Sequence, residues 1–235
     1  MAEASHVARA RLPATVYDLA RRLRVKPEDG LSGVTLSHTG QMRQKADAPW
    51  SAFTARQTIA VTRCAFDWKA RTGPGGMVSV RDALVDGVGH LHVRAVGLIT
   101  LARAKPSAEL TRGELMRYLA ELPWAPDAIL RNADLGWRED GPDRLIVGAG
   151  AGETAAEVTL TLDGEGRIVG AFAPDRGALI DGVTVPTPWR GAFSDYRLHD
   201  GVWLPFFGEV SWEMPAGTFT YWQGQIATWK RTLND

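Results

Sequence analysis

Alternation of apolar and polar residues, broken by tight turns, is the feature that most constrains how this chain folds. In the stretch "AFDWKARTG", the apolar residues Phe66, Trp68 and Ala70 alternate with charged ones, as in a strand with one buried face. Asp-Gly pairs at 86–87 and 200–201 are typical of two-residue hairpin turns. Strands joined in this way pair antiparallel with their sequence neighbours. We expect about nine or ten strands in an antiparallel meander.

One clear helical stretch, "TRGELMRYLAELPWAP", interrupts this pattern at residues 111–126. Thr111 followed by Glu114 predicts a capping box at its start, and Pro123 predicts its end. Leucines recur with helical spacing at Leu115, Leu119 and Leu122. Because a helix inserted between strands must bury its apolar stripe, the concave face of a curved sheet is the expected place for it.

The predicted fold class is therefore α+β and mostly antiparallel β. A strongly curved sheet or open barrel wraps around a central helix at about 112–122, and a short helix at about 13–25 precedes it. Neither a linker nor an internal repeat divides the chain, so residues 1–235 are expected to form a single domain, with the sheet and its inserted helix at about 33–231.

The charge balance and the N-terminal sequence exclude some functions. The 27 basic residues balance 27 acidic ones, which argues against a nucleic-acid binder. The N-terminus carries no long apolar run, so we expect no stable membrane insertion and a cytoplasmic location. The sequence leaves the oligomeric state open.

Aromatic residues gather near the C-terminus, where five of the nine tryptophans fall between residues 189 and 229. In the last predicted strand, aromatic residues occupy both faces, with Tyr221 expected on one and Trp222 on the other. Either one face lines an apolar pocket, or the sheet is covered on both sides. The residues expected to bind a ligand are Trp68, Tyr118, Trp124, Tyr196, Trp212, Tyr221 and Trp222.

Charged residues on the predicted helix allow a second kind of site. Glu114, Arg117 and Glu121 share one side of it. If this side faces the sheet, the residues converge on a cavity and are suited to acid–base chemistry. If it faces outward, which is the arrangement we favour, they form a solvated ladder of ion pairs. The candidate catalytic residues are Asp82, Glu114, Glu121, Glu209, Arg43 and Arg71.

No cofactor and no metal are expected, because the chain lacks their usual motifs. His90 and His92 share a strand face without an acidic or cysteine partner at a signature spacing. The glycine-rich stretch at 148–152 matches neither the dinucleotide nor the phosphate-loop pattern. The single cysteine, Cys64, is expected to be a small buried residue rather than a catalytic thiol.

Several stretches, in this order, resemble a family of uncharacterised bacterial proteins known as a domain of unknown function. The most specific are "RGELMRYLAELPW" and "GEVSW" followed by "YW". The succession of strands, helix and strands also resembles the curved-sheet fold of periplasmic lipoprotein carriers. The resemblance implies a fold and no activity. It covers about residues 12–230 and matches Arg43, Gln57, Trp68, Arg71, Asp82, Glu114, Arg117, Tyr118, Glu121, Trp124, Trp189, Tyr196, Glu209, Trp212, Tyr221 and Trp222.

Three functions fit these observations. The first is binding of an apolar or amphipathic small molecule, such as a lipid, in an aromatic-lined cavity. The second is a cofactor-independent hydrolase, lyase, isomerase or cyclase acting on a small hydrophobic substrate with carboxylates and arginines. The third is an interaction or structural domain whose aromatic face meets a protein partner.

Overall fold

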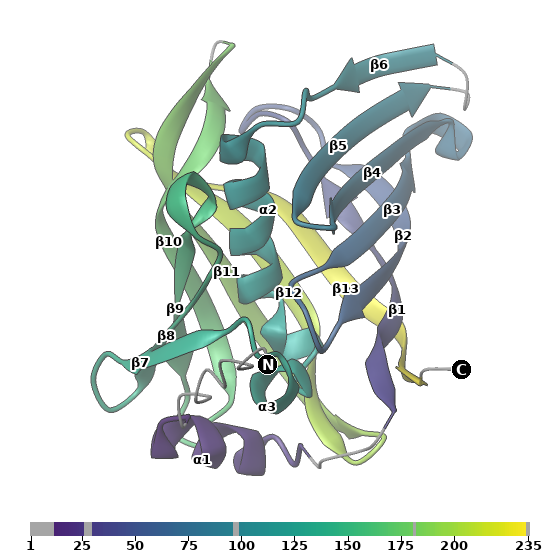
Figure 1. Ribbon diagram of the computed structural model, residues 1–235. Helices are drawn as coiled ribbons and strands as arrows, with labels where there is room; N and C mark the ends of the chain where they lie inside the picture. The colour runs from purple at the N-terminus through teal and green to yellow at the C-terminus, as the bar shows by residue number, and fades with distance from the viewer. Residues whose placement is uncertain (1–11, 26–29, 96–98, 181, 234–235) are drawn as a thin grey trace, which may run out of the picture.

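A single curved antiparallel sheet of thirteen strands wraps around one helix, as the computed structural model shows (Figure 1). The structure describes residues 12–25, 30–95, 99–180 and 182–233. Its strands are β1 (Leu31–Met42), β2 (Ser51–Ala60), β3 (Phe66–Thr72), β4 (Val78–Val85), β5 (Val88–Ala95), β6 (Ile99–Arg103), β7 (Gly136–Glu139), β8 (Arg144–Ala149), β9 (Ala156–Leu162), β10 (Ile168–Ile180), β11 (Val183–His199), β12 (Val202–Met214) and β13 (Gly217–Leu233). Its helices are α1 (Ala14–Arg22), α2 (Ala108–Ala120) and α3 (Ala128–Arg131), with short 3-10 turns η1 (Pro74–Gly76), η2 (Leu122–Trp124) and η3 (Gly152–Thr154).

Strand order follows the sequence on both sides of one central pair. The order is β6-β5-β4-β3-β2-β1-β13-β12-β11-β10-β9-β8-β7, so among the described strands only β1 and β13 pair across a long sequence separation. Asp86 and Gly87, between β4 and β5, have φ angles of 49° and 74°. The pair at 200–201, between β11 and β12, also has positive φ, as two-residue hairpin turns of this type require. The predicted fold class and these two turns are confirmed.

Helix α2 lies in the hollow of the sheet and fills part of it (Figure 1). Leu115, Leu119 and Leu122 are all buried, which confirms the apolar stripe. At the N-terminal end, Gly89 of β5 allows a close approach, because a methyl group there would lie 2.9 Å from the Cα of Thr111. The backbone N–H of Gly89 donates a hydrogen bond to the Thr111 hydroxyl.

The predicted capping box is wrong, because α2 begins one turn earlier. Ser107 is the N-cap, and its hydroxyl accepts a hydrogen bond from the N–H of Leu110. Thr111 lies inside the helix and bonds to the sheet instead. The expected number of strands, nine or ten, is also too low, since the sheet has thirteen. Two of the additional strands are β6 and β7, which have only five and four residues and carry no clear alternation.

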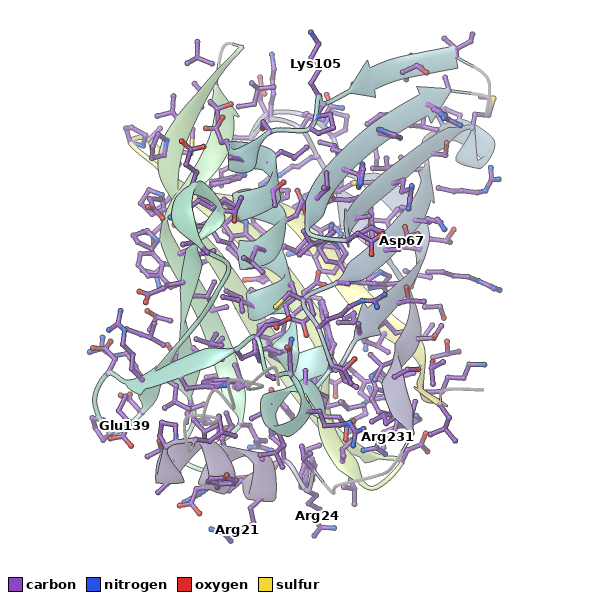
Figure 2. All side chains as sticks on the ribbon, viewed as in Figure 1. Arg21, Arg24, Asp67, Lys105, Glu139 and Arg231 are labelled. Carbon is purple, nitrogen blue, oxygen red and sulfur yellow. The ribbon has the colours of Figure 1, made fainter. Side chains whose placement is uncertain are left out.

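Helix α1 crosses one end of the sheet, at the bottom of Figure 1, next to α3. Its residues Val16 and Leu19 are buried, and the N–H of Trp203 donates to the carbonyl of Leu23 just beyond the helix. Arg21 and Arg24 project away from the sheet at this end (Figure 2). Within the described residues, no helix is long and apolar enough to cross a membrane.

Two irregularities in the strands decide which side chains face the hollow. In β10, Ala173 pairs with Trp189 and Arg176 pairs with Thr187 of β11. The first two residues are three positions apart and their partners only two, so β10 carries an extra residue. In β13, Thr220 and Trp222 pair with adjacent residues of β12, which leaves Tyr221 as an extra residue. A β-bulge of this kind shifts the inward–outward alternation of everything beyond it.

Candidate functional site

A cavity of about 840 Å³ lies between α2 and the concave face of the sheet. Its volume is within the range of about 300–1,000 Å³ usual for small-molecule sites. Its wall includes Leu101 of β6 and Leu179 of β10, which are 58% and 76% exposed. The cavity therefore reaches the surface near these two residues, whose strands extend to the top of Figure 1. Lys105 projects at the same end, where the chain passes from β6 to α2 (Figure 2).

Aromatic rings make up much of the cavity wall. Those among its lining residues are Trp68, Trp124, Trp189, Phe193, Trp212, Phe219, Tyr221 and Trp222. Two strand glycines make room for them, because a methyl group on Gly208 would lie 2.8 Å from the Trp124 ring and one on Gly224 would overlap the Trp222 ring. Trp124 is further fixed by hydrogen bonds, since its indole N–H donates to the carbonyl of Pro205 and its own carbonyl accepts from the indole of Trp229.

A buried histidine lies among these rings. The His38 ring centroid is 5.7 to 6.2 Å from those of Phe53, Trp68, Trp124 and Trp222. The Trp68 indole donates to His38 Nε2 at 2.7 Å, so this nitrogen is the unprotonated one. Burial, with a smaller effect of the Arg117 charge, lowers the pKa of His38 to about 3. The imidazole is therefore neutral at physiological pH and packs against the tryptophan rings of the cavity wall.

The charged side of α2 faces the cavity and not the solvent, so the favoured prediction of a solvated ladder is wrong. Arg117 binds Glu121 at 2.8 Å and Asp82 of β4 at 2.5 Å. These three side chains are only 10–15% exposed. Gln57 donates a short hydrogen bond to Glu121 from the opposite side. Burial alone would lower the pKa of Arg117, but the charges of Glu121 and Asp82 outweigh it and raise that pKa.

Glu114 lies one turn before Arg117 and is more deeply buried. Its Oε1 is 3.9 Å from Arg176 Nη2, and its Oε2 has no hydrogen-bond partner among the described residues. Burial, together with the neighbouring charge of Asp82, raises the pKa of Glu114 well above its usual value. Burial and the charge of Asp82 therefore both disfavour the charged form of Glu114.

The other predicted catalytic residues lie apart from this cluster. Arg43 lines the cavity, and its guanidinium donates to the carbonyls of Thr220 and Ala46. Glu209 is at the cavity border, but its carboxylate accepts from Gln223. Arg71 lies on the opposite face of the sheet, where it lines a separate hollow.

The structure brings five of the seven predicted ligand-binding residues to the cavity. They are Trp68, Trp124, Trp212, Tyr221 and Trp222. The prediction that Tyr221 and Trp222 face opposite ways is wrong, because the β13 bulge places both rings against the cavity. Tyr118 and Tyr196 are not in the lining, since their hydroxyls donate to the carbonyls of Ala60 and Ile168. Burial raises the pKa of both phenols.

The sequence pattern does not single out Arg176 and Phe193, which line the cavity, or His38, which packs against its tryptophan rings. Phe193 and His38 occupy inward positions of clearly alternating strands, which is the signal that could have found them. Arg176 carries no such signal, because its inward position depends on the β10 bulge.

Neither metal ligation nor thiol chemistry is supported by the geometry. Among the described residues, no group of three His, Cys, Asp or Glu side chains could hold a metal ion. Cys64 lies in the loop between β2 and β3, where Asn132 donates a hydrogen bond to its sulfur. Burial raises the pKa of Cys64 to about 12, so the reactive thiolate is scarce at neutral pH.

A half-barrel with a helix and an aromatic cavity in its hollow places the protein among the curved-sheet folds of the lipoprotein-carrier type. The chain belongs to the family of unknown function DUF6544, whose model matches residues 3–224.

Two similar solved structures share little sequence with the chain. A putative outer membrane lipoprotein-sorting protein domain from Vibrio parahaemolyticus has a TM-score of 0.50 and 10% identity, over 93% of this chain and 91% of that one. A LolA superfamily protein from Nitrosomonas europaea has a TM-score of 0.49 and 10% identity, over 95% of each chain. No curated protein matches the sequence. At this identity the likeness concerns the fold alone.

Proposed function

We propose that this protein binds an apolar or amphipathic small molecule in the cavity between α2 and the sheet. The observation that carries the proposal is an open cavity of about 840 Å³ lined by eight aromatic side chains. The rings are fixed by close packing against strand glycines and by hydrogen bonds, so they form a preshaped apolar surface. Such a surface lowers the entropic cost of binding. The Vibrio domain of the same fold is described as lipoprotein-sorting, and a ligand with an acyl chain agrees with that description.

An enzymatic role has weaker support. Acid–base catalysis requires a carboxyl group that reaches the substrate. Asp82 and Glu121 line the cavity but are held by Arg117, Glu209 lines it and accepts a hydrogen bond from Gln223, and Glu114 is not part of the lining. A binding role needs no freely available carboxylate, and we therefore favour it.

The test is to purify the protein under native conditions, extract any bound molecule with solvent and identify it by mass spectrometry. Gly191 lines the cavity, whereas its neighbour Ala192 is exposed on the other face of β11. Gly191→Trp should block the cavity and abolish co-purification, and Ala192→Trp is the matched control. Equal recovery of the same amphiphile from both variants would refute the proposed site.

A further inference from the structure

The cavity contains an arginine whose hydrogen-bonding capacity is unused. Arg176 of β10 is only 9% exposed, and its guanidinium lines the cavity. A guanidinium has five N–H donors, and a buried one normally finds acceptors. Within the described part of the chain, Arg176 makes no hydrogen bond, and its only acidic neighbour is Glu114 at 3.9 Å. This distance is too long for a hydrogen bond.

Aromatic rings hold the guanidinium in place. Its carbon lies 4.5 Å from the Trp189 ring centroid and 5.9 Å from that of Trp212. The Trp189 indole donates to the hydroxyl of Tyr221, whose ring stacks on Trp212. Stacking on an aromatic face leaves the edge of the guanidinium, which carries the N–H groups, free to bind an anion.

The β10 bulge directs this side chain inward. Side chains alternate between the two faces of a regular strand. Without the extra residue, Arg176 would therefore lie on the opposite face from Ala173 and point away from the cavity. Helix α2 fixes the bulge, because Arg112 binds the carboxylate of Asp175 at 2.9 Å and its carbonyl at 3.2 Å. Bulges of this kind are common beside functional sites, where they re-aim a side chain.

The other arginines of the cavity do not share this property. Arg117 binds two carboxylates, and Arg43 donates to two backbone carbonyls. Burial, together with the charge of Asp82, raises the pKa of Glu114, and this disfavours the charged form of the carboxyl group nearest to Arg176. Among the described residues, Arg176 is thus the cavity arginine that makes no hydrogen bond, and its ion pair with Glu114 is 3.9 Å long.

We infer that Arg176 is the binding site for a singly charged oxyanion, a carboxylate or a phosphodiester, at the head of an amphipathic ligand. This inference rests on the proposed function, because the apolar part of the ligand would occupy the aromatic cavity. One guanidinium supplies one positive charge and two parallel N–H groups, which match a single oxyanion. The anion would also accept hydrogen bonds from N–H groups that have no protein acceptor among the described residues.

The experiment compares dodecanoate, lysophosphatidylglycerol and uncharged dodecanol, below their aggregation concentrations, by quenching of tryptophan fluorescence. Charge-assisted hydrogen bonds should make the better of the two anions bind about 10- to 100-fold more tightly than dodecanol. Arg176→Met should remove this preference and leave dodecanol binding unchanged. Arg190→Met is the matched control, because Arg190 is exposed on the outer face and pairs with Glu213. Thermal unfolding of each variant verifies that it is folded.

The outcomes separate this inference from the proposed function. Anion preference that is lost in Arg176→Met and kept in Arg190→Met supports the site, and the preferred anion identifies the head group. Equal binding of dodecanol and both anions overturns the site at Arg176 but leaves the apolar cavity supported. A preference that survives in Arg176→Met and disappears in Arg43→Met also overturns the assignment. If no amphiphile binds to the wild-type protein, both proposals fail.

Discussion

Replacing Arg117 with methionine is the sharpest test of how the charged side of α2 is placed. Methionine keeps much of the apolar stem, so the main loss is the guanidinium. Its removal leaves Asp82 and Glu121, which are 15% and 10% exposed, as carboxylates without a cation. Breaking a buried ion pair by removing one partner costs about 3–5 kcal/mol, whereas exposed pairs contribute only about 0.2–1 kcal/mol. A domain is stabilised by only about 5–15 kcal/mol in total, so the expected loss is large.

The assay is urea unfolding at neutral pH followed by circular dichroism, with wild-type protein alongside. Arg117→Met should lower the free energy of unfolding by about 3–5 kcal/mol. A triple variant with Asp82→Asn and Glu121→Gln should recover much of this loss, because it removes the uncompensated charges. A loss below about 1 kcal/mol, or a triple variant no more stable than the single one, would refute the buried arrangement.

Three further changes test other parts of the site. Burial and the charge of Asp82 raise the pKa of Glu114, so the wild-type protein should lose stability relative to Glu114→Gln as the pH rises from the ordinary carboxyl pKa of 4.5 towards the raised pKa. The urea midpoints of both proteins are measured between pH 5 and 9, and midpoints that shift in parallel would contradict this prediction. Gly224→Ala should lower the free energy of unfolding in urea by about 1–3 kcal/mol, because the added methyl group would overlap the Trp222 ring. Gly191→Ala should lower it less, because a methyl group there would lie 3.6 Å from its nearest neighbour. Cys64, with its pKa of about 12, should react with iodoacetamide at pH 8 at least about a hundredfold more slowly in the folded protein than in urea, and comparable rates would mean that its thiol is not shielded.

The regular parts of the fold could be predicted because local patterns determine them. The alternation around Trp68 and the Asp-Gly turn at 86–87 each require only a few neighbouring residues. The leucine stripe likewise predicts that α2 is buried on one side. Its charged side was assigned to solvent because single-sequence patterns do not show what a helix packs against. Asp82, the partner that draws Arg117 inward, lies 35 positions earlier in the chain.

The site itself was only half predictable, because bulges determine part of it. Trp212 and Trp222 could be found from aromatic density alone. Arg176 could not, since one extra residue in β10 inverts the alternation that normally indicates its direction. Pro174, which has no N–H for the strand ladder, is the local hint of that irregularity. The same reasoning explains why Tyr221 and Trp222, although adjacent, both face the cavity.

The strand order has a consequence for how this chain reaches its fold. Strands β1 to β6 and strands β7 to β13 are two meanders, in which each strand pairs with its neighbour in sequence. Of the strands that the structure describes, only β1 and β13 join them within the sheet, and this pair brings together residues such as Ser32 and Thr232, 200 positions apart. Local hairpins close quickly, whereas pairing across so long a chain has a large entropic cost. Folding should therefore be limited by the meeting of two preformed halves, and the cavity, whose wall comes from both, should be among the last features to form.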